Sequence, residues 1–210
     1  ALDGVGLGDD GTAWGGELLR LDGAGYARLG HLSPIPLPSG DRAAKEPWRM
    51  AAAALHRLGR GGEIAGRFPG QPAAGRMGQV LDLGLNCPPT TSLGRWFDAA
   101  AGLLGAREVM AYEGQAAMLL EGLAAGAQVA PVAGGWLLHP DGRLDLWPLL
   151  ARLADEPGAA LGAALFHATL AEGLAAWVAW AAGREDLTRV VLGGGCLLNQ
   201  ILSRDLTRRL

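Results

Sequence analysis

The chain has 210 residues, half of them hydrophobic, and a formal net charge of −3. This length allows one large domain or two small lobes with a substantial core. The weak charge and scattered basic residues leave no electrostatic case for a nucleic-acid or membrane partner. Two cysteines, Cys87 and Cys196, form neither a disulfide framework nor a CxxC metal motif, which favours a reducing, cytoplasmic setting.

The first forty residues have the pattern of β-structure. Residues 13–21 and 26–32 are joined by an Asp-Gly turn, a spacing typical of a β-hairpin. A helix is expected from Glu46-Pro47 to Leu58, because proline suits a first helical turn. Residues 59–79 are rich in Gly and Arg and are predicted to be a surface loop or an irregular insert.

The middle of the chain is predicted to be helical. Thr91 or Ser92 is placed to cap a helix over residues 93–104, which Gly105 ends. A second helix is expected from Glu113-Gly114 to about residue 125. Residues 129–147 favour short β or irregular structure.

The last third combines a long apolar helix with a glycine-rich turn. Residues 158–182 are apolar nearly all round, which predicts a helix buried between layers and not a membrane span. His167 within it is interpreted as a core histidine with satisfied hydrogen bonds. Residues 188–192 are predicted to be a strand that leads through three glycines into a helix over residues 197–210.

A strand–glycine–helix junction is one way to hold a nucleotide. Glycines let the backbone approach a ligand closely, and the helix N-terminus favours anions. The alternative interpretation is a tight turn without a ligand. A second glycine-rich turn at residues 3–12 favours the nucleotide, and together the elements predict a turn-rich α/β protein.

Six collinear blocks of the sequence carry a family resemblance. The blocks are Leu2–Gly8 with Asp10–Glu17, Gly40-Asp41 with Glu46–Met50, Thr91–Ala99, Tyr112–Met118, Leu165–His167, and Gly194-Gly195 with Asn199. The order of elements resembles the actin-like ATPase superfamily, and the six blocks are similar to the C-terminal domain of the hydrogenase-maturation carbamoyltransferase family, HypF. The resemblance covers essentially the whole chain and implies a ribonuclease H-like, two-lobed architecture with mixed sheets flanked by helices.

The resemblance implies a carbamoyl transfer. Family members make carbamoyl-adenylate from carbamoyl phosphate and ATP, and pass the carbamoyl group to the C-terminal cysteine of the partner HypE. The product becomes the cyanide ligand of NiFe hydrogenase. A mixed carbamic–phosphoric anhydride has a good leaving group, and a metal can clamp its phosphate.

The same resemblance assigns the site residues. The hairpin residues would cradle the phosphates, with Asp3 also a ligand of a divalent metal, whether iron, zinc or magnesium. Asp98 would hydrogen-bond the ribose, Gly114 would allow close approach of the nucleoside, and the remainder would contact adenosine. The complete nucleotide-binding set is Leu2, Asp3, Gly4, Val5, Gly6, Asp98, Gly114, Gly194, Gly195 and Asn199.

The chain also departs from the family pattern. Its four histidines do not form the HxxxH metal motif that precedes the hairpin in the family. The expectation is therefore part of a larger domain, inactive alone. In this interpretation residues 1–40 form the phosphate hairpin, 41–90 a helix plus an irregular insert, and 91–210 a helical block ending in the adenosine motif.

Two other functions remain open. One is a carbamoyltransferase of the same superfamily that acts on the oxygen or nitrogen of a small molecule or of tRNA. The other is a noncatalytic nucleotide-binding assembly module, which would keep the fold without the metal site.

Overall fold

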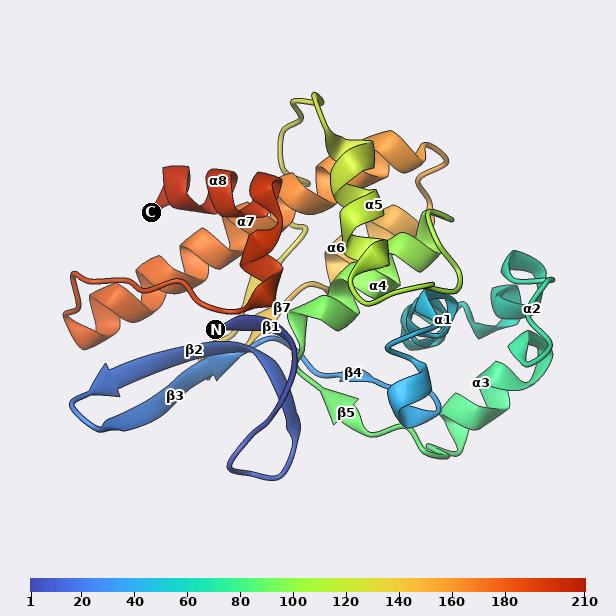
Figure 1. The fold of residues 1–210 in the computed structure, drawn as a ribbon, viewed down its shortest axis with the longest axis horizontal. Coiled ribbons are helices and arrows are strands. Elements are labelled where there is room, and N and C mark those ends of the chain that lie inside the picture. The colour runs from blue at the N-terminus through green and yellow to red at the C-terminus, as the bar shows by residue number, and fades with distance from the viewer.

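The computed structural model describes residues 1–210, with a β-sheet at one end and helices around a central pair, α1 and α4 (Figure 1). The strands are β1 (Leu2–Leu7), β2 (Ala13–Asp22), β3 (Gly25–His31), β4 (Ile35–Pro36), β5 (Pro89–Thr90), β6 (Leu137–Leu138) and β7 (Leu144–Asp145). The helices are α1 (Pro47–Arg57), α2 (Ile64–Arg67), α3 (Ala74–Asp82), α4 (Leu93–Leu103), α5 (Gln115–Ala124), α6 (Trp147–Ala154), α7 (Ala159–Glu185) and α8 (Gln200–Arg209). Single 3-10 turns occupy Gly40–Arg42, Gly61–Glu63 and Gly195–Leu198.

Strand β2 organises the sheet. It pairs antiparallel with β1 through its first residues and with β3 through the rest, and it meets β5 in parallel at Ala13 and Thr90. The predicted β2–β3 hairpin is confirmed, with Asp22 opposite Gly25 across the turn. The β1–β2 register shifts between Leu2 and Gly6, so the intervening residues of β1 form a bulge.

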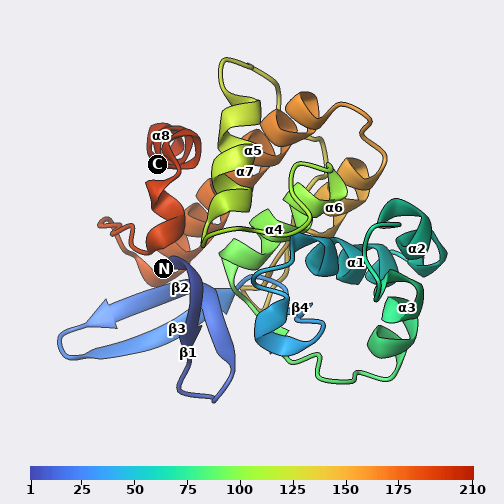
Figure 2. The same cartoon turned by 45° about the vertical axis from the view of Figure 1, so that its right-hand side comes forward.

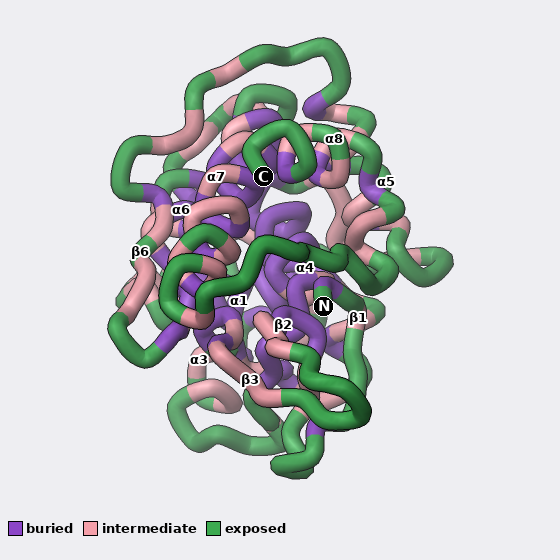
Figure 3. The backbone as a smooth tube through the Cα atoms, turned by 90° about the vertical axis from the view of Figure 1, so that its left-hand side faces the viewer, coloured by how far each residue is buried: buried purple, intermediate pink, exposed green.

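The core lies between the helices and the sheet, where Figure 3 shows buried backbone along α1, α4 and the middle of α7. Trp96, Phe97 and Phe166 are fully buried there, and the rings of Phe97 and Phe166 meet edge to face at 4.9 Å. The expected helices α1, α4 and α5 begin and end within a few residues of the predicted positions.

Helix α7 is long and apolar enough, by length and composition, to cross a membrane, yet 56% of its most apolar 18-residue stretch is buried inside the fold. Its buried side chains include Phe166, Leu170 and Trp177, whereas Leu161 is 45% exposed. The helix is therefore packed into the core, as predicted, but it is not covered all round.

The prediction of a surface loop over residues 59–79 is wrong. This stretch holds α2 and most of α3, which lie beside α1 away from the β2–β3 hairpin (Figure 2). Ile64, Phe68 and Met77 are buried against the core, so the segment is packed. Two of the arginines that gave it a surface composition form ion pairs with Glu63, Arg60 at 2.6 Å and Arg67 at 3.0 Å.

The strand predicted over residues 188–192 is absent. A strand needs a paired neighbour, and the backbone bond of this stretch to β1 is made only at its end, by Leu2 N to Gly193 O at 2.8 Å. Val191 is 76% exposed. The following α-helix begins at Gln200 and not at Leu197, because a 3-10 turn and the extended residue Asn199 precede it.

Packing of the α2–α3 segment predicts a large effect of truncating a buried side chain there. We expect Met77→Ala to lower the free energy of unfolding by roughly 2–5 kcal/mol, since Met77 is fully buried. Urea unfolding checks this. Leu83→Ala is the control, because Leu83 is 70% exposed and should change stability by less than about 0.5 kcal/mol. Equal, small effects at both positions would show that the segment is not packed.

Candidate functional site

The two glycine-rich segments at opposite ends of the sequence lie side by side. Figures 1 and 2 both place the start of β1 against the turn before α8. Gly195 N donates to Asp3 Oδ1 at 3.3 Å. Gly194 has φ +110°, and a Cβ there would lie 2.2 Å from Leu2 O, so only glycine fits. The contact joins the predicted phosphate and adenosine segments into one site.

The bulge of β1 is held against the N-terminus of α4. Ser92 occupies the predicted N-cap, but its hydroxyl donates to β1, to Asp3 O at 3.1 Å and to Gly4 O, and accepts no cap bond from the helix. In a planar trans peptide the N–H points opposite to the C=O. The N–H groups of Gly4 and Val5 are therefore directed away from α4.

That outward side of the bulge has room for a ligand. A Cβ added to Gly4 or Gly6 would meet nothing within 4 Å. The Gly4 N–H donates to Asp3 Oδ1 at 2.7 Å, which holds the carboxylate beside the bulge. Successive backbone N–H groups on an open surface are a known way of binding phosphate.

Asp98 is a buried carboxyl with spare hydrogen-bonding capacity. It is 3% exposed, and Arg95 Nε lies 2.6 Å from its Oδ2. The direction of approach does not make a hydrogen bond, so both atoms lack a well-oriented partner. Burial raises the pKa of Asp98 to about 7, against the opposing charge of Arg95. Near neutral pH the carboxyl can both donate to and accept from a hydroxyl.

Cys196 lies within the electrostatic reach of the same groups. Burial raises the pKa of its thiol to about 12, the charges of Asp3 and Asp98 add to the rise, and Arg95 opposes it. The thiol is therefore protonated at neutral pH and is a poor nucleophile.

The side chain of Asn199 is fully occupied inside the protein. Its Oδ1 accepts from Leu202 N at 2.9 Å and caps α8, and its amide donates to His167 Nε2 at 3.0 Å. His167 Nδ1 donates to Ala163 O at 2.8 Å, and burial lowers the pKa of His167. The prediction that His167 is a satisfied core histidine is confirmed. Nucleoside contact by Asn199 stays a prediction.

The structure does not bring every predicted residue together. Gly114 is the N-cap of α5 with φ +77°, and a Cβ there would have no neighbour within 4 Å. A cavity of about 860 Å³ between α5, α7 and α8 is lined by His167, Gln200 and Arg204 among others, but by none of the predicted nucleotide-binding residues. A smaller one of about 420 Å³ reaches Val5 and Gly6.

The residues present do not fit a complete metal centre. No three His, Cys, Asp or Glu side chains of the chain gather in a way that holds a metal ion. Asp3 supplies one carboxylate at most, which does not complete the coordination of a metal ion.

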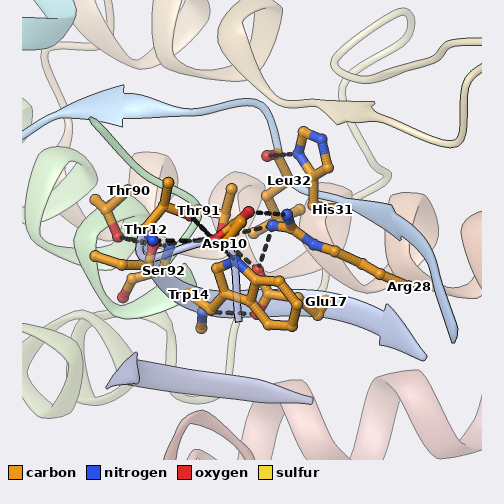
Figure 4. Close-up of polar contacts among 12 residues, drawn as sticks. Asp10, Thr12, Trp14, Glu17, Arg28, His31, Leu32, Thr90, Thr91 and Ser92 are labelled. Carbon is orange, nitrogen blue, oxygen red and sulfur yellow. Dashed lines mark hydrogen bonds and ion pairs between the residues drawn. The ribbon is translucent and has the colours of Figure 1, made fainter. Parts of the chain in front are cut away.

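Sequence reasoning missed a polar network beneath the hairpin, in which Arg28 lies between Asp10 and Glu17 (Figure 4). Glu17 is 2% exposed and also accepts from Thr91. The available signal was a charged residue within the apolar run of β2. Its partner Arg28 could be found only from the strand register, in which Arg28 is opposite Leu19.

Residues 1–210 match the family model described as "Carbamoyltransferase, Kae1-like Domain, second subdomain". The chain belongs to the HypF carbamoyltransferase family. The predicted family and its mixed α/β fold are therefore confirmed.

Several relatives show how much of such proteins this chain represents. It is 56% identical to carbamoyltransferase HypF2 of Cupriavidus necator and 46% identical to HypF of Rhizobium leguminosarum bv. viciae. All of the chain is matched in both, but only 29% and 28% of those proteins.

The chain superposes on full-length HypF solved in the phosphate- and nucleotide-bound form with a TM-score of 0.85 and 28% identity, covering 100% of this chain and 28% of that one. The T. kodakarensis HypF structure gives a TM-score of 0.84 at 28% identity, with 100% and 29% covered.

The double role of Asn199 predicts a loss of stability on truncation. Asn199→Ala removes a helix cap, worth about 1 kcal/mol, and leaves His167 Nε2 without its donor, at a further cost of about 1–3 kcal/mol. Urea unfolding measures the sum. Ser203→Ala, on the same helix, is the control and should be nearly neutral. An Asn199 variant as stable as the wild type would contradict the assignment.

The raised pKa of Asp98 predicts a pH-dependent stability. Folded Asp98 titrates at about 7 and an unfolded aspartate at about 3.9, so between these values the folded chain holds the extra proton. Stability therefore falls as pH rises from about 4 to 7, by roughly 1 kcal/mol per pH unit from this group. Asp98→Asn should remove this slope. Urea unfolding of the wild type and of Asp98→Asn from pH 5 to 8 isolates the contribution of Asp98 to stability, because His167 contributes equally to both proteins.

Proposed function

We propose that the chain is the nucleotide-binding part of a carbamoyltransferase that moves a carbamoyl group from carbamoyl-adenylate to a cysteine thiol of HypE. The observation that carries this is the contact of the β1 bulge with the Gly194-Gly195 turn, which puts a phosphate-type surface beside the predicted adenosine segment. A nucleotide-bound HypF of the same fold supports the ligand class. The family membership supports the transfer.

Each part of the site has a distinct task in this proposal. The N–H of Val5 binds a phosphate oxygen on the open side of the bulge, beside the Gly4 N–H, which donates to Asp3 Oδ1. Asp98, whose Oδ2 lies 2.6 Å from Arg95 Nε, receives a ribose hydroxyl. As the carbamoyl group leaves, negative charge returns to the phosphate, and donors already aimed there stabilise it.

The accepting thiol comes from outside the chain in this mechanism. With a pKa of about 12, the Cys196 thiol holds its proton at neutral pH and does not compete for the carbamoyl group. Cys87 also has a raised thiol pKa, because it is partly buried. A partner cysteine such as that of HypE therefore fits the chemistry better than either cysteine of this chain.

Gly4→Val tests the phosphate surface. The new side chain meets no protein atom within 4 Å of its Cβ, so the fold should survive, while the space for a phosphate is filled. Affinity for ATP should fall at least about tenfold, because one or more hydrogen bonds to a charged phosphate are lost. Isothermal titration calorimetry measures this.

Gly70→Val is the matched control, since its Cβ also meets open space, far from the site, and ATP affinity should not change. Unchanged ATP binding by Gly4→Val would overturn the site. Nucleotide binding without carbamoyl transfer to a HypE cysteine, in the longer protein as well, would instead favour a noncatalytic nucleotide-binding module.

A further inference from the structure

An ion pair between a buried carboxylate and a partly buried guanidinium lies beside the bulge of β1. Glu17, on β2, is 2% exposed, and its Oε1 lies 3.1 Å from an Nη of Arg28 on β3. Thr91 also donates to this carboxylate. Such a pair is rarely retained for stability alone, because the cost of removing two charges from water offsets their attraction.

The carboxylate of Glu17 replaces a bond of the β-ladder. Its Oε2 accepts from the backbone N–H of Gly15 at 2.6 Å. Gly15 lies opposite the bulge, between the paired positions Leu2–Gly16 and Gly6–Trp14. Its φ is +155°, and a Cβ there would be 2.7 Å from Asp3 O. Because this N–H is turned to Glu17, it does not pair with β1, and the bulge is left open.

Arg28 extends the same network to the loop between β1 and β2. Its second Nη lies 3.1 Å from Asp10 Oδ2, and its guanidinium stacks 4.0 Å from the centre of the Trp14 ring. Asp10 Oδ1 in turn accepts from Thr12 N at 2.9 Å and from Trp14 Nε1 at 2.9 Å. The loop that joins β1 to β2 is thereby fixed to the body of the sheet.

Two consecutive residues connect this network to α4. Thr91 donates to Glu17, and Ser92 donates to the carbonyl groups of Asp3 and Gly4 in the bulge. Both sides of the bulge are thus held, the N–H of the opposite strand by Glu17 and its own carbonyls by Ser92.

We propose that Glu17 and Arg28 form a positioning pair that keeps the β1 bulge in its phosphate-binding shape, and so set the affinity for the phosphate chain and not for the nucleoside. This rests on the proposed nucleotide-binding function. Neither side chain needs to touch the ligand. Both act through the backbone of Gly15 and through the loop between β1 and β2.

The test compares two ligands on the full chain. Arg28→Lys keeps the charge but loses the planar fork that reaches Glu17 and Asp10 together, and Glu17→Gln removes the charge of the acceptor. We expect each to weaken ATP binding roughly tenfold, the equivalent of one charge-assisted hydrogen bond, while adenosine binding stays within about twofold of the wild type. A merely structural role would change both affinities together or neither.

Arg20→Lys is the matched control. Arg20 also lies on β2 and makes one ion pair, with Glu185 at 2.6 Å, but it is remote from the bulge. Its ratio of ATP to adenosine affinity should equal that of the wild type. Calorimetry with both ligands, after thermal unfolding has shown that each variant is folded, gives the ratios.

A double variant covers the case in which one unpaired buried charge prevents folding. Glu17→Met with Arg28→Met removes both charges with little change in volume. A folded double variant whose ATP to adenosine ratio matches the wild type would overturn the positioning role. A wild-type chain that binds neither ligand would overturn the proposed function and this inference together, which distinguishes the two failures.

Discussion

The close approach of Gly194 to Leu2 is the constraint on which the site depends. A Cβ added to Gly194 would lie 2.2 Å from Leu2 O, so the two segments meet backbone to backbone. This contact fixes the glycine turn against the start of β1. The Asp3–Gly195 bond follows from it. Residues that are almost the whole sequence apart become one surface because the sheet begins where the final helix starts (Figure 1).

Two buried carboxylates near this surface differ in how far the protein satisfies their hydrogen-bonding capacity. Glu17 accepts from a backbone N–H, a hydroxyl and a guanidinium, so its oxygens are used within the protein. Asp98 has only Arg95, in an orientation that makes no hydrogen bond, and burial raises its pKa to about 7. A satisfied carboxylate shapes its surroundings, whereas one with an unpartnered oxygen retains the capacity to bind a ligand. This distinction fits a structural role for Glu17 and the proposed ribose contact of Asp98.

Much of the fold could be predicted from local signals. The Asp22–Gly25 turn, the proline at the start of α1 and the glycine that ends α4 each act through backbone geometry that the sequence itself contains. The failures concern tertiary contacts. The glycines and arginines of residues 59–79 concealed helices that are packed by Ile64, Phe68 and Met77. The β-branched run at 188–192 has strand propensity, but propensity without a paired neighbour does not make a strand.

The candidate site shows the same contrast between local signals, which could be predicted, and tertiary contacts, which could not. Glycine spacing located the two segments that meet, yet it did not reveal the groups that hold them in shape. Ser92 was expected to cap α4, and its hydroxyl instead holds the carbonyls of β1. Asn199 was expected to contact a nucleoside, and its amide and oxygen are both used inside the protein. A motif fixes which side chain is present, but its role depends on which polar partners remain unsatisfied. By that criterion the side chain of Asn199 and the Gly4 N–H, which donates to Asp3 Oδ1, are used within the protein, whereas Oδ2 of Asp98 has no well-oriented partner.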